Sequence, residues 1–307
     1  MTRAPLLAWV LLILLAAIWG GSFMLTNVAV RELPPLTVVA LRLCLATGLV
    51  WAYATARGAR LPNLRVADGR RIGKFALGAA IVGNVLPFSL ISWAQLYIPS
   101  ALSGLLMAPM PLMVLMLSHF LIAGERLTTP RVIGFIIGFA GVAILIGGEA
   151  IAQLGRGDAL ALVGQVATLA AAFGYACSSI ILKRANPPDP LGISIMILGI
   201  GAMITLPAAL MVESPDLTAA SWLTIACVIG LGVGATGLAQ VLLMKIIGLA
   251  GPPFLSLVNY QVPVWAVIFG VLLLGETLPG AFWPALALIL IGLAIAQFIG
   301  QRRTPHV

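Results

Sequence analysis

Ten apolar runs separated by short polar breaks constrain what this chain can fold into. The runs are 17 to 26 residues long and cover residues 6–28, 36–55, 72–96, 101–123, 132–148, 159–182, 191–212, 222–247, 254–274 and 282–299. A helix of about 20 apolar residues crosses the hydrocarbon core of a bilayer. Strands of a membrane barrel would be about ten residues long and alternate in polarity, and these runs do not alternate. The sequence therefore predicts an all-α polytopic membrane protein with ten transmembrane helices.

Charge is too scarce here for a water-soluble protein. The 307 residues are 61% hydrophobic and 8% charged, whereas soluble proteins contain about 25% charged residues. The net charge of +8 would indicate nucleic acid only if the basic residues gathered on one soluble face. We therefore expect the chain to contact the lipid bilayer and no nucleic acid. Cys44, Cys177 and Cys227 lie in apolar runs without the spacing of disulfides or zinc ligands, so we interpret them as packing residues.

The basic residues are distributed unevenly between the two sides of the membrane. If the amino terminus is cytoplasmic, 14 of the 17 Lys and Arg residues lie on the cytoplasmic side. They are Arg3, Arg57, Arg60, Arg65, Arg70, Arg71, Lys74, Arg126, Arg131, Lys183, Arg184, Lys245, Arg302 and Arg303. Because Lys and Arg accumulate in cytoplasmic loops, this asymmetry predicts a multi-pass protein of the bacterial inner (plasma) membrane with both termini in the cytoplasm.

The second half of the sequence resembles the first at an offset near 152 to 154 residues. The correspondences join Trp19-Gly20 to Phe173-Gly174, Pro34-Pro35 to Pro187-Pro188, Pro111 to Pro263 and, after one single-residue indel, Gly124-Glu125 to Gly275-Glu276. Each half contains five spans, an odd number, so the second half enters the membrane in the opposite orientation. We predict two inverted five-helix repeats, residues 1–148 and 149–307, with a substrate site near the midplane between them.

Several motifs carry a family resemblance. They are the A-A-I-W-G segment at 16–20, the S-A-L-S-G-L-L segment at 100–106 that runs into Pro111, and the paired Gly-Glu endings. Together they resemble the paired EamA modules of the drug/metabolite transporter superfamily, and within it bacterial inner-membrane exporters of amino acids, particularly aromatic ones. The resemblance implies that spans one to four and six to nine surround a cavity for a small-molecule substrate, with spans five and ten peripheral.

Polar and aromatic residues recur inside the spans, many at the three- to four-residue spacing of one helix face. We predict that they line the substrate cavity, because amides and hydroxyls that face lipid are costly. They are Trp19, Ser22, Phe23, Asn84, Phe88, Ser92, Trp93, Gln165, Tyr175, Ser179, Gln240, Asn259, Tyr260 and Trp265. The alternative is hydrogen bonding between helices together with an interfacial aromatic belt. A cavity of this composition suits a zwitterionic or aromatic small molecule.

Two further residues belong to the predicted substrate site. Arg42 lies about 9 Å inside the second span, at 1.5 Å per residue, where an arginine costs roughly 2.5–3.5 kcal/mol unless it reaches water. It could hold a substrate carboxylate through bidentate hydrogen bonds, or it could bond to helix carbonyls in a structural role. Met107 begins a stripe that continues through Met110, Met113 and Met116. This stripe could form an adaptable cavity wall or pack ordinarily between helices.

Prolines and small residues mark candidate points of movement and close packing. Pro87, Pro109, Pro111 and Pro263 remove backbone hydrogen bonds inside spans, so we predict that they act as hinges for alternating access. Small residues recur every four positions at Gly134 and Gly138, and at Gly292, Ala296 and Gly300. These stripes could join helices within one chain or form a dimer face, so both a monomer and a homodimer remain open.

The acidic residues bear on how transport is driven. No Asp or Glu lies clearly in the middle of a span, so we expect gradient-driven export rather than a carboxylate proton relay. For Glu125 and Glu276 we expect contacts with backbone groups at span ends, and for His119 a packing role.

An exporter of aromatic or neutral amino acids and related metabolites is the predicted function, by alternating access through a central cavity. A multidrug or cationic-compound exporter of the same fold is the alternative. An intramembrane enzyme is the alternative from another class, but no residue pattern for catalysis, a metal or a cofactor is present.

Overall fold

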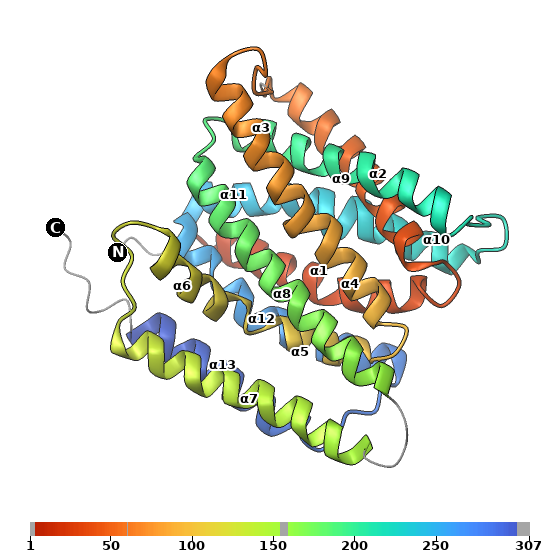
Figure 1. Cartoon of the computed structure of the whole chain (residues 1–307), viewed down its shortest axis with the longest axis vertical. Helices are drawn as coiled ribbons and strands as arrows, with labels where there is room; N and C mark the ends of the chain where they lie inside the picture. The colour runs from red at the N-terminus through yellow and green to blue at the C-terminus, as the bar shows by residue number, and fades with distance from the viewer. Residues whose placement is uncertain (1–3, 60, 154–158, 300–307) are drawn as a thin grey trace.

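All elements that the structure describes are helical. The structure is a computed structural model that describes residues 4–59, 61–153 and 159–299 (Figure 1). The α-helices are α1 (Leu6–Ala29), α2 (Pro35–Ala56), α3 (Ala67–Ala80), α4 (Leu86–Ala94), α5 (Ser100–Met107), α6 (Met110–Leu121), α7 (Thr129–Gln153), α8 (Ala159–Ala185), α9 (Pro190–Val212), α10 (Trp222–Ile229), α11 (Ala239–Leu255), α12 (Val258–Leu274) and α13 (Phe282–Ala294). Arg3, Arg60, Gly300, Arg302 and Arg303 lie outside the described residues.

Ten membrane-crossing segments are present in the described chain, as predicted. Eight are long and apolar enough to cross a membrane by length and composition, and two shorter apolar helices, Val258–Leu274 and Phe282–Gln297, complete the set. Two of the long segments contain a π-helical stretch in the middle, at Ile81–Val85 and Gly230–Leu238. The predicted all-α polytopic fold is therefore confirmed.

The structure interrupts the predicted fourth span, and it places the turn between the eighth and ninth spans within the predicted break at 248–253. The fourth span is interrupted after Met107, because Pro109 and Pro111 leave carbonyls of the preceding turn without an N–H donor, and it forms α5 and α6. The turn between the eighth and ninth spans occurs at Gly251, whose φ of 81° is left-handed. Pro252 and Pro253 follow this glycine directly, so the ninth span begins with two residues that lack an N–H.

Alternating helix directions place the loops on two faces of the bundle. We define the terminal face as the end that carries the loops at 57–66, 122–128 and 186–189 and the turn at Gly251. The far face carries the loops at 30–34, 95–99, 213–221 and 275–281. Nine of the basic residues named above, Arg57, Arg65, Arg70, Arg71, Lys74, Arg126, Arg131, Lys183 and Arg184, lie in or beside the loops of the terminal face.

Small residues bring helices from the two halves into close contact. A Cβ atom added at Gly20 of α1 would collide with Trp265 of α12 and its neighbours. The fifth and tenth spans meet in the same way, since a Cβ on Gly134 of α7 would collide with the carbonyl of Gly292 of α13. The predicted small-residue stripes thus face each other within the chain, and α7 and α13 run side by side at one edge of the bundle (Figure 1).

Candidate functional site

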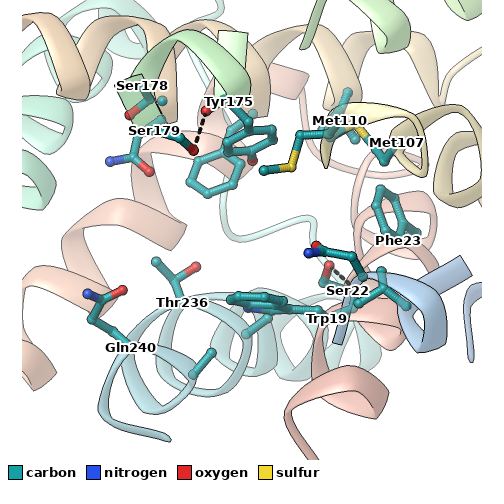
Figure 2. Close-up of a pocket in the computed structure, with 18 of the residues that line it drawn as sticks. Trp19, Ser22, Phe23, Met107, Met110, Tyr175, Ser178, Ser179, Thr236 and Gln240 are labelled. Carbon is teal, nitrogen blue, oxygen red and sulfur yellow. Dashed lines mark hydrogen bonds between the residues drawn. The ribbon is translucent and has the colours of Figure 1, made fainter. Parts of the chain in front are cut away.

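A cavity of about 380 Å³ lies between the two halves of the chain. Its walls come from α1, α2, α4, α5, α6, α8, α9, α11 and α12 and from both mid-span π-helical stretches. Within the described chain, α7 and α13 contribute no residue to the lining, which agrees with the peripheral position that the family resemblance implies. Figure 2 shows Tyr175, Ser178 and Ser179 of α8 across the cavity from Trp19 of α1 and from Thr236.

Arg42 is fixed at the cavity wall by a threonine of the other half. The side chain of Arg42 is 9% exposed, and its Nε donates to Thr236 Oγ1 at 2.8 Å. The Thr236 hydroxyl donates in turn to the carbonyl of Leu231 at 3.0 Å, five residues earlier, as the π-helical stretch allows. π-Helical turns occur often at functional sites. Here the wider turn leaves the Thr236 oxygen free to accept the guanidinium.

Glycines in the same π-helical stretch allow α2 to approach closely. A Cβ on Gly232 would lie 3.0 Å from the carbonyl oxygen of Arg42 and 2.6 Å from the Cβ of Leu45. Gly237 faces Leu49 of the same helix, 2.6 Å from its Cδ2. The glycine-rich sequence 230–238 therefore positions the arginine by removing side chains that would push α2 away.

Arg42 has an aromatic neighbour and no acidic partner in the described lining. Its guanidinium carbon lies 3.8 Å from the centroid of the Phe88 ring, and Tyr175 contacts that ring edge-on with centroids 6.1 Å apart. Among the described residues that line the cavity, Arg42 alone carries a charge. A cation–π contact compensates only part of the cost of burying a guanidinium. The cavity therefore favours an anionic group beside Arg42.

Hydroxyls and amides at the wall are oriented by hydrogen bonds to their own helix or to a neighbouring one. Ser22 donates to the carbonyl of Trp19 at 2.6 Å, and Ser179 donates to that of Tyr175 at 2.9 Å. Gln240 Nε2 donates to Ser194 Oγ at 2.9 Å, which links α11 to α9. A hydroxyl whose proton is already engaged still offers lone pairs, so these groups can accept hydrogen bonds from a substrate ammonium.

The structure brings eleven of the sixteen residues predicted for the substrate site to one cavity. They are Trp19, Ser22, Phe23, Arg42, Asn84, Phe88, Met107, Tyr175, Ser179, Gln240 and Asn259. Two of the predicted hinge prolines, Pro111 and Pro263, also lie in the lining. Of the other two, Pro109 occupies the break between α5 and α6, and Pro87 lies in the first turn of α4.

Five predicted site residues lie outside the cavity lining. Ser92 is buried at 3% exposure, and the ring of Trp93 packs against Tyr97 with centroids 5.1 Å apart. Gln165 is fully buried within α8. The Tyr260 hydroxyl donates to the carbonyl of Leu293 of α13 at 2.9 Å, and Trp265 stacks on Phe269. Tyr260 thus bonds to a neighbouring helix, as in the alternative of interhelical hydrogen bonding, whereas the rings of Trp93 and Trp265 contact aromatic residues four positions later in the chain.

Sequence reasoning overlooked four polar residues of the lining. Thr26, Ser178, Ser194 and Thr236 line the cavity, and Thr236 and Ser194 hold Arg42 and Gln240, respectively. The available signal was a hydroxyl inside an apolar span, four residues before Gln240 for Thr236. Serine and threonine also bond to their own helix in lipid, so that signal alone does not distinguish a site residue.

The cavity extends toward the terminal face between α6 and the turn at Gly251. At the far side α5 packs against α12, whereas α6 packs against α7 and α8. A second cavity of about 320 Å³ shares Met110, Pro111, Ser179 and Asn259 with the first. Its lining continues to Pro253, beside that turn, and to Arg131 at the start of α7. The described cavity therefore approaches solvent at the terminal face.

His119 and Glu125 lie together at the terminal face, away from the described lining of the first cavity. The Nδ1 atom of His119 is 3.2 Å from the carbonyl oxygen of Glu125 and 3.3 Å from the backbone nitrogen of Leu127. The carboxylate of Glu125 forms an ion pair with Lys183 at the end of α8. Hydrogen bonds and the charge of Lys183 hold the pKa of Glu125 below its ordinary value, although partial burial acts in the opposite direction.

A protein-family comparison identifies the fold. The model of the EamA-like transporter family matches residues 7–147 and again residues 160–298. The chain belongs to the EamA-like transporter family. One of the two matches falls in each half of the chain. As a member of this family, the protein is a transporter and not an enzyme.

Curated relatives of this EamA protein are bacterial and archaeal transporters. It is 28% identical to the uncharacterized inner membrane transporter YedA of Escherichia coli K12, over 91% of this chain and 86% of YedA. It is 27% identical to a probable amino-acid metabolite efflux pump of Salmonella typhimurium, over 97% of each chain. It is also 27% identical to the aromatic amino acid exporter YddG of Ancylobacter novellus, over 93% of this chain and 95% of that protein.

Two further comparisons match the chain with lower coverage or lower sequence identity. An uncharacterized transporter of Archaeoglobus fulgidus is 28% identical over 58% of this chain, and the match spans only 60% of that relative. A crystal structure of another protein superposes on this chain with a TM-score of 0.66 at 23% sequence identity, and the superposition covers 96% of this chain and 99% of the other. The protein is thus a multi-pass inner-membrane transporter of the EamA type.

Proposed function

We propose that this protein exports aromatic or neutral amino acids and related small metabolites, with Arg42 holding the substrate carboxylate. The observation that carries the proposal is a buried guanidinium without an acidic partner in the described cavity lining. A carboxylate would compensate this charge, and it fits a guanidinium through two parallel hydrogen bonds. Names of relatives that include an amino-acid metabolite efflux pump and an aromatic amino acid exporter support the same substrate class.

The rest of the cavity suits the remainder of such a molecule. Trp19, Phe23 and Phe88 offer apolar faces, and the oxygens of Ser22, Ser179 and Asn259 offer acceptors for an ammonium group. Clefts of a few hundred Å³ with apolar walls and few polar groups are typical of small-molecule sites. A zwitterion with an apolar side chain therefore matches the lining better than a polyanion does.

Transport proceeds in our proposal by alternating access between the two repeats, residues 1–148 and 149–307. The terminal face is cytoplasmic because it carries the basic loops, so the cavity takes substrate from the cytoplasm. The candidate hinges are Pro87, Pro109, Pro111 and Pro263. No Asp or Glu occurs in the described lining, which supports export down the gradient of the substrate itself.

A multidrug or cationic-compound exporter is the second candidate. The adaptable side chains of Met107 and Met110 and the aromatic walls favour it. The buried positive charge of Arg42 opposes it, because like charges in a site of low dielectric repel strongly.

Efflux from proteoliposomes loaded with amino acids or with cationic dyes tests the proposal. We expect saturable efflux of aromatic or neutral amino acids that falls at least tenfold in Arg42→Gln, with normal amounts of folded protein. Arg42→Lys keeps the charge without the planar pair of donors, so it should retain part of the rate. Efflux of dyes without efflux of any amino acid would refute the proposed substrate class.

The energy source is tested in the same vesicles. We expect amino-acid efflux to continue at an unchanged initial rate when a protonophore removes any proton gradient. Strict dependence on a proton gradient would exclude the gradient-driven mechanism while leaving the substrate class intact.

A further inference from the structure

Three glutamates on the far face each bind the start of a helix that belongs to the other half of the chain. The carboxylate of Glu213, at the end of α9, accepts hydrogen bonds from the backbone of Leu36 at 2.9 Å and of Thr37 at 2.7 Å. The Thr37 hydroxyl donates to it as well, at 2.8 Å. These contacts join the seventh span to the second across 176 to 177 residues of sequence.

Glu276 makes the corresponding contact between the ninth and fourth spans. Its two oxygens accept from the backbone of Ser100 at 2.7 Å and of Ala101 at 2.9 Å, the first residues of α5. Glu32 acts in the opposite direction, because this residue of the first half accepts from the backbone of Ser221 at 2.7 Å, just before α10. That amide also holds the pKa of Glu32 below its ordinary value.

The local sequence is arranged to place Glu276 over α5. Gly275 ends α12 with a left-handed φ of 67°, and the amide of Glu276 then turns back to the carbonyl of Gly270 at 3.1 Å. A Cβ on Gly270 would collide with Oε2 of Glu276 and would lie 3.1 Å from Ser100 Oγ. Glycine at 270 therefore makes the space in which the carboxylate lies between α12 and α5.

The chemistry of these contacts suits a reversible closure. A helix start has backbone N–H groups without intrahelical partners and a partial positive charge, so a carboxylate there is stabilised strongly. Beneath the glutamates, Leu33 and Val38 of the first half pack with Val228 and Leu231 of the second in one buried cluster. Separating the halves at this face would break the carboxylate bonds and expose that cluster together.

We propose that Glu32, Glu213 and Glu276, here named the far-face glutamates, hold the cavity closed on the far side and must release their helix starts for substrate to leave. This inference rests on the proposed alternating access. The far-face glutamates are positioning residues, because they control which side of the membrane reaches the cavity and are not among the described residues that line it.

Cysteine labelling measures far-side access without reference to any substrate. A reporter, Ser22→Cys, is placed at the cavity wall in a chain whose Cys44, Cys177 and Cys227 are replaced by alanine. A membrane-impermeant maleimide is then applied to the side on which Leu217→Cys, a half-exposed residue of a far-face loop, reacts. We expect Glu213→Gln/Glu276→Gln to raise the far-side labelling rate of the reporter about tenfold or more.

Two variants control for folding and for charge. Thr37→Val removes one donor to Glu213 with little change in shape, so it should raise the rate about threefold and add nothing in the Glu213→Gln chain. Asp216→Asn is the matched control, because Asp216 lies in the same loop as Glu213 but accepts hydrogen bonds from Thr218 and Ala219 of its own loop. Its labelling rate should equal that of the parent.

The outcomes separate this inference from the proposed function. Faster far-side labelling in the glutamate variants supports closure by the glutamates even if no amino acid is exported, a result that would refute the substrate proposal alone. Unchanged labelling in both the double glutamine variant and Thr37→Val overturns the inference, even if the parent chain exports amino acids.

Discussion

The two Gly-Glu sequences of the repeat are similar in sequence but make different contacts on opposite faces. On the far face, Gly275 turns the chain and Glu276 binds two backbone amides of α5. On the terminal face, Gly124 also has a left-handed φ, of 86°, but Glu125 pairs with Lys183 instead. Equivalent motifs thus serve a helix-to-helix contact in one place and an exposed ion pair in the other.

The helix starts opposite the two motifs explain this difference. Ser100 lies eleven residues before Pro111, and Pro252 lies eleven residues before Pro263, so the two are equivalent in the repeat. Ser100 and Ala101 each offer an N–H to Glu276. Pro252 and Pro253 have none to offer, so Glu125 has no equivalent partner there. In our proposal, this difference in sequence contributes to closure at the far face and to access at the terminal face.

Adding backbone N–H donors to the start of the ninth span should produce the largest change in labelling rate. In Pro252→Ser/Pro253→Ala the start of the ninth span regains two N–H groups that Glu125 can bind when the halves approach. Hydrogen bonds to charged groups contribute about 1.5–3 kcal/mol each. We expect terminal-side labelling of the Ser22→Cys reporter to slow about tenfold. The same slowing in a chain that also carries Glu125→Gln would show that the prolines act in another way.

Filling the space that the Glu276 carboxylate occupies should have an intermediate effect on the far-side labelling rate. Gly270→Ala adds a methyl group where the carboxylate lies, so we expect far-side labelling to rise about fivefold, with no further rise in Glu276→Gln. Gly280→Ala is the matched control, because Gly280 lies in the following loop with no atom within 4 Å of an added Cβ. A fivefold rise in both variants would contradict a specific role of Gly270.

Removing the ion pair of the terminal face should have the smallest effect. The side chains of Lys183 and Glu125 are 49% and 36% exposed, and exposed pairs contribute about 0.2–1 kcal/mol. Arg184 also holds the carbonyl of Leu121 at 2.7 and 3.1 Å, which the substitution leaves in place. We expect Glu125→Gln to change the labelling rate from either side less than about threefold. A tenfold change would contradict the difference between Glu125 and Glu276.

The sequence predicted the membrane spans well because long apolar runs leave few alternatives. It did not predict that the fourth span divides into two helices after Met107, because hydropathy averages over single glycines and prolines. The π-helical stretch around Thr236 was also missed. It lies where α2 closely approaches Gly232 and Gly237, a contact between distant parts of the chain.

Helical spacing located most of the cavity residues but not the rotation of each helix. Phe88 and Ser92 share a face of α4, yet only Phe88 lies in the cavity lining. Trp265 was grouped with Asn259 in α12, but it stacks on Phe269 instead. For Glu276 the expected contact with backbone groups is present. Its donors, however, lie 175 and 176 residues away in the sequence, beyond the reach of local patterns.

Competition between phenylalanine and phenylalaninamide tests most directly whether Arg42 holds a substrate carboxylate. The two compounds share a side chain and an amino group, and only phenylalanine carries a carboxylate. We measure how strongly each one inhibits export of a labelled amino acid by the parent protein and by Arg42→Gln. We expect phenylalaninamide to inhibit export by the parent protein at least tenfold more weakly than phenylalanine does. In Arg42→Gln we expect the two compounds to inhibit equally. Equal inhibition of the parent by both compounds would contradict this role of Arg42.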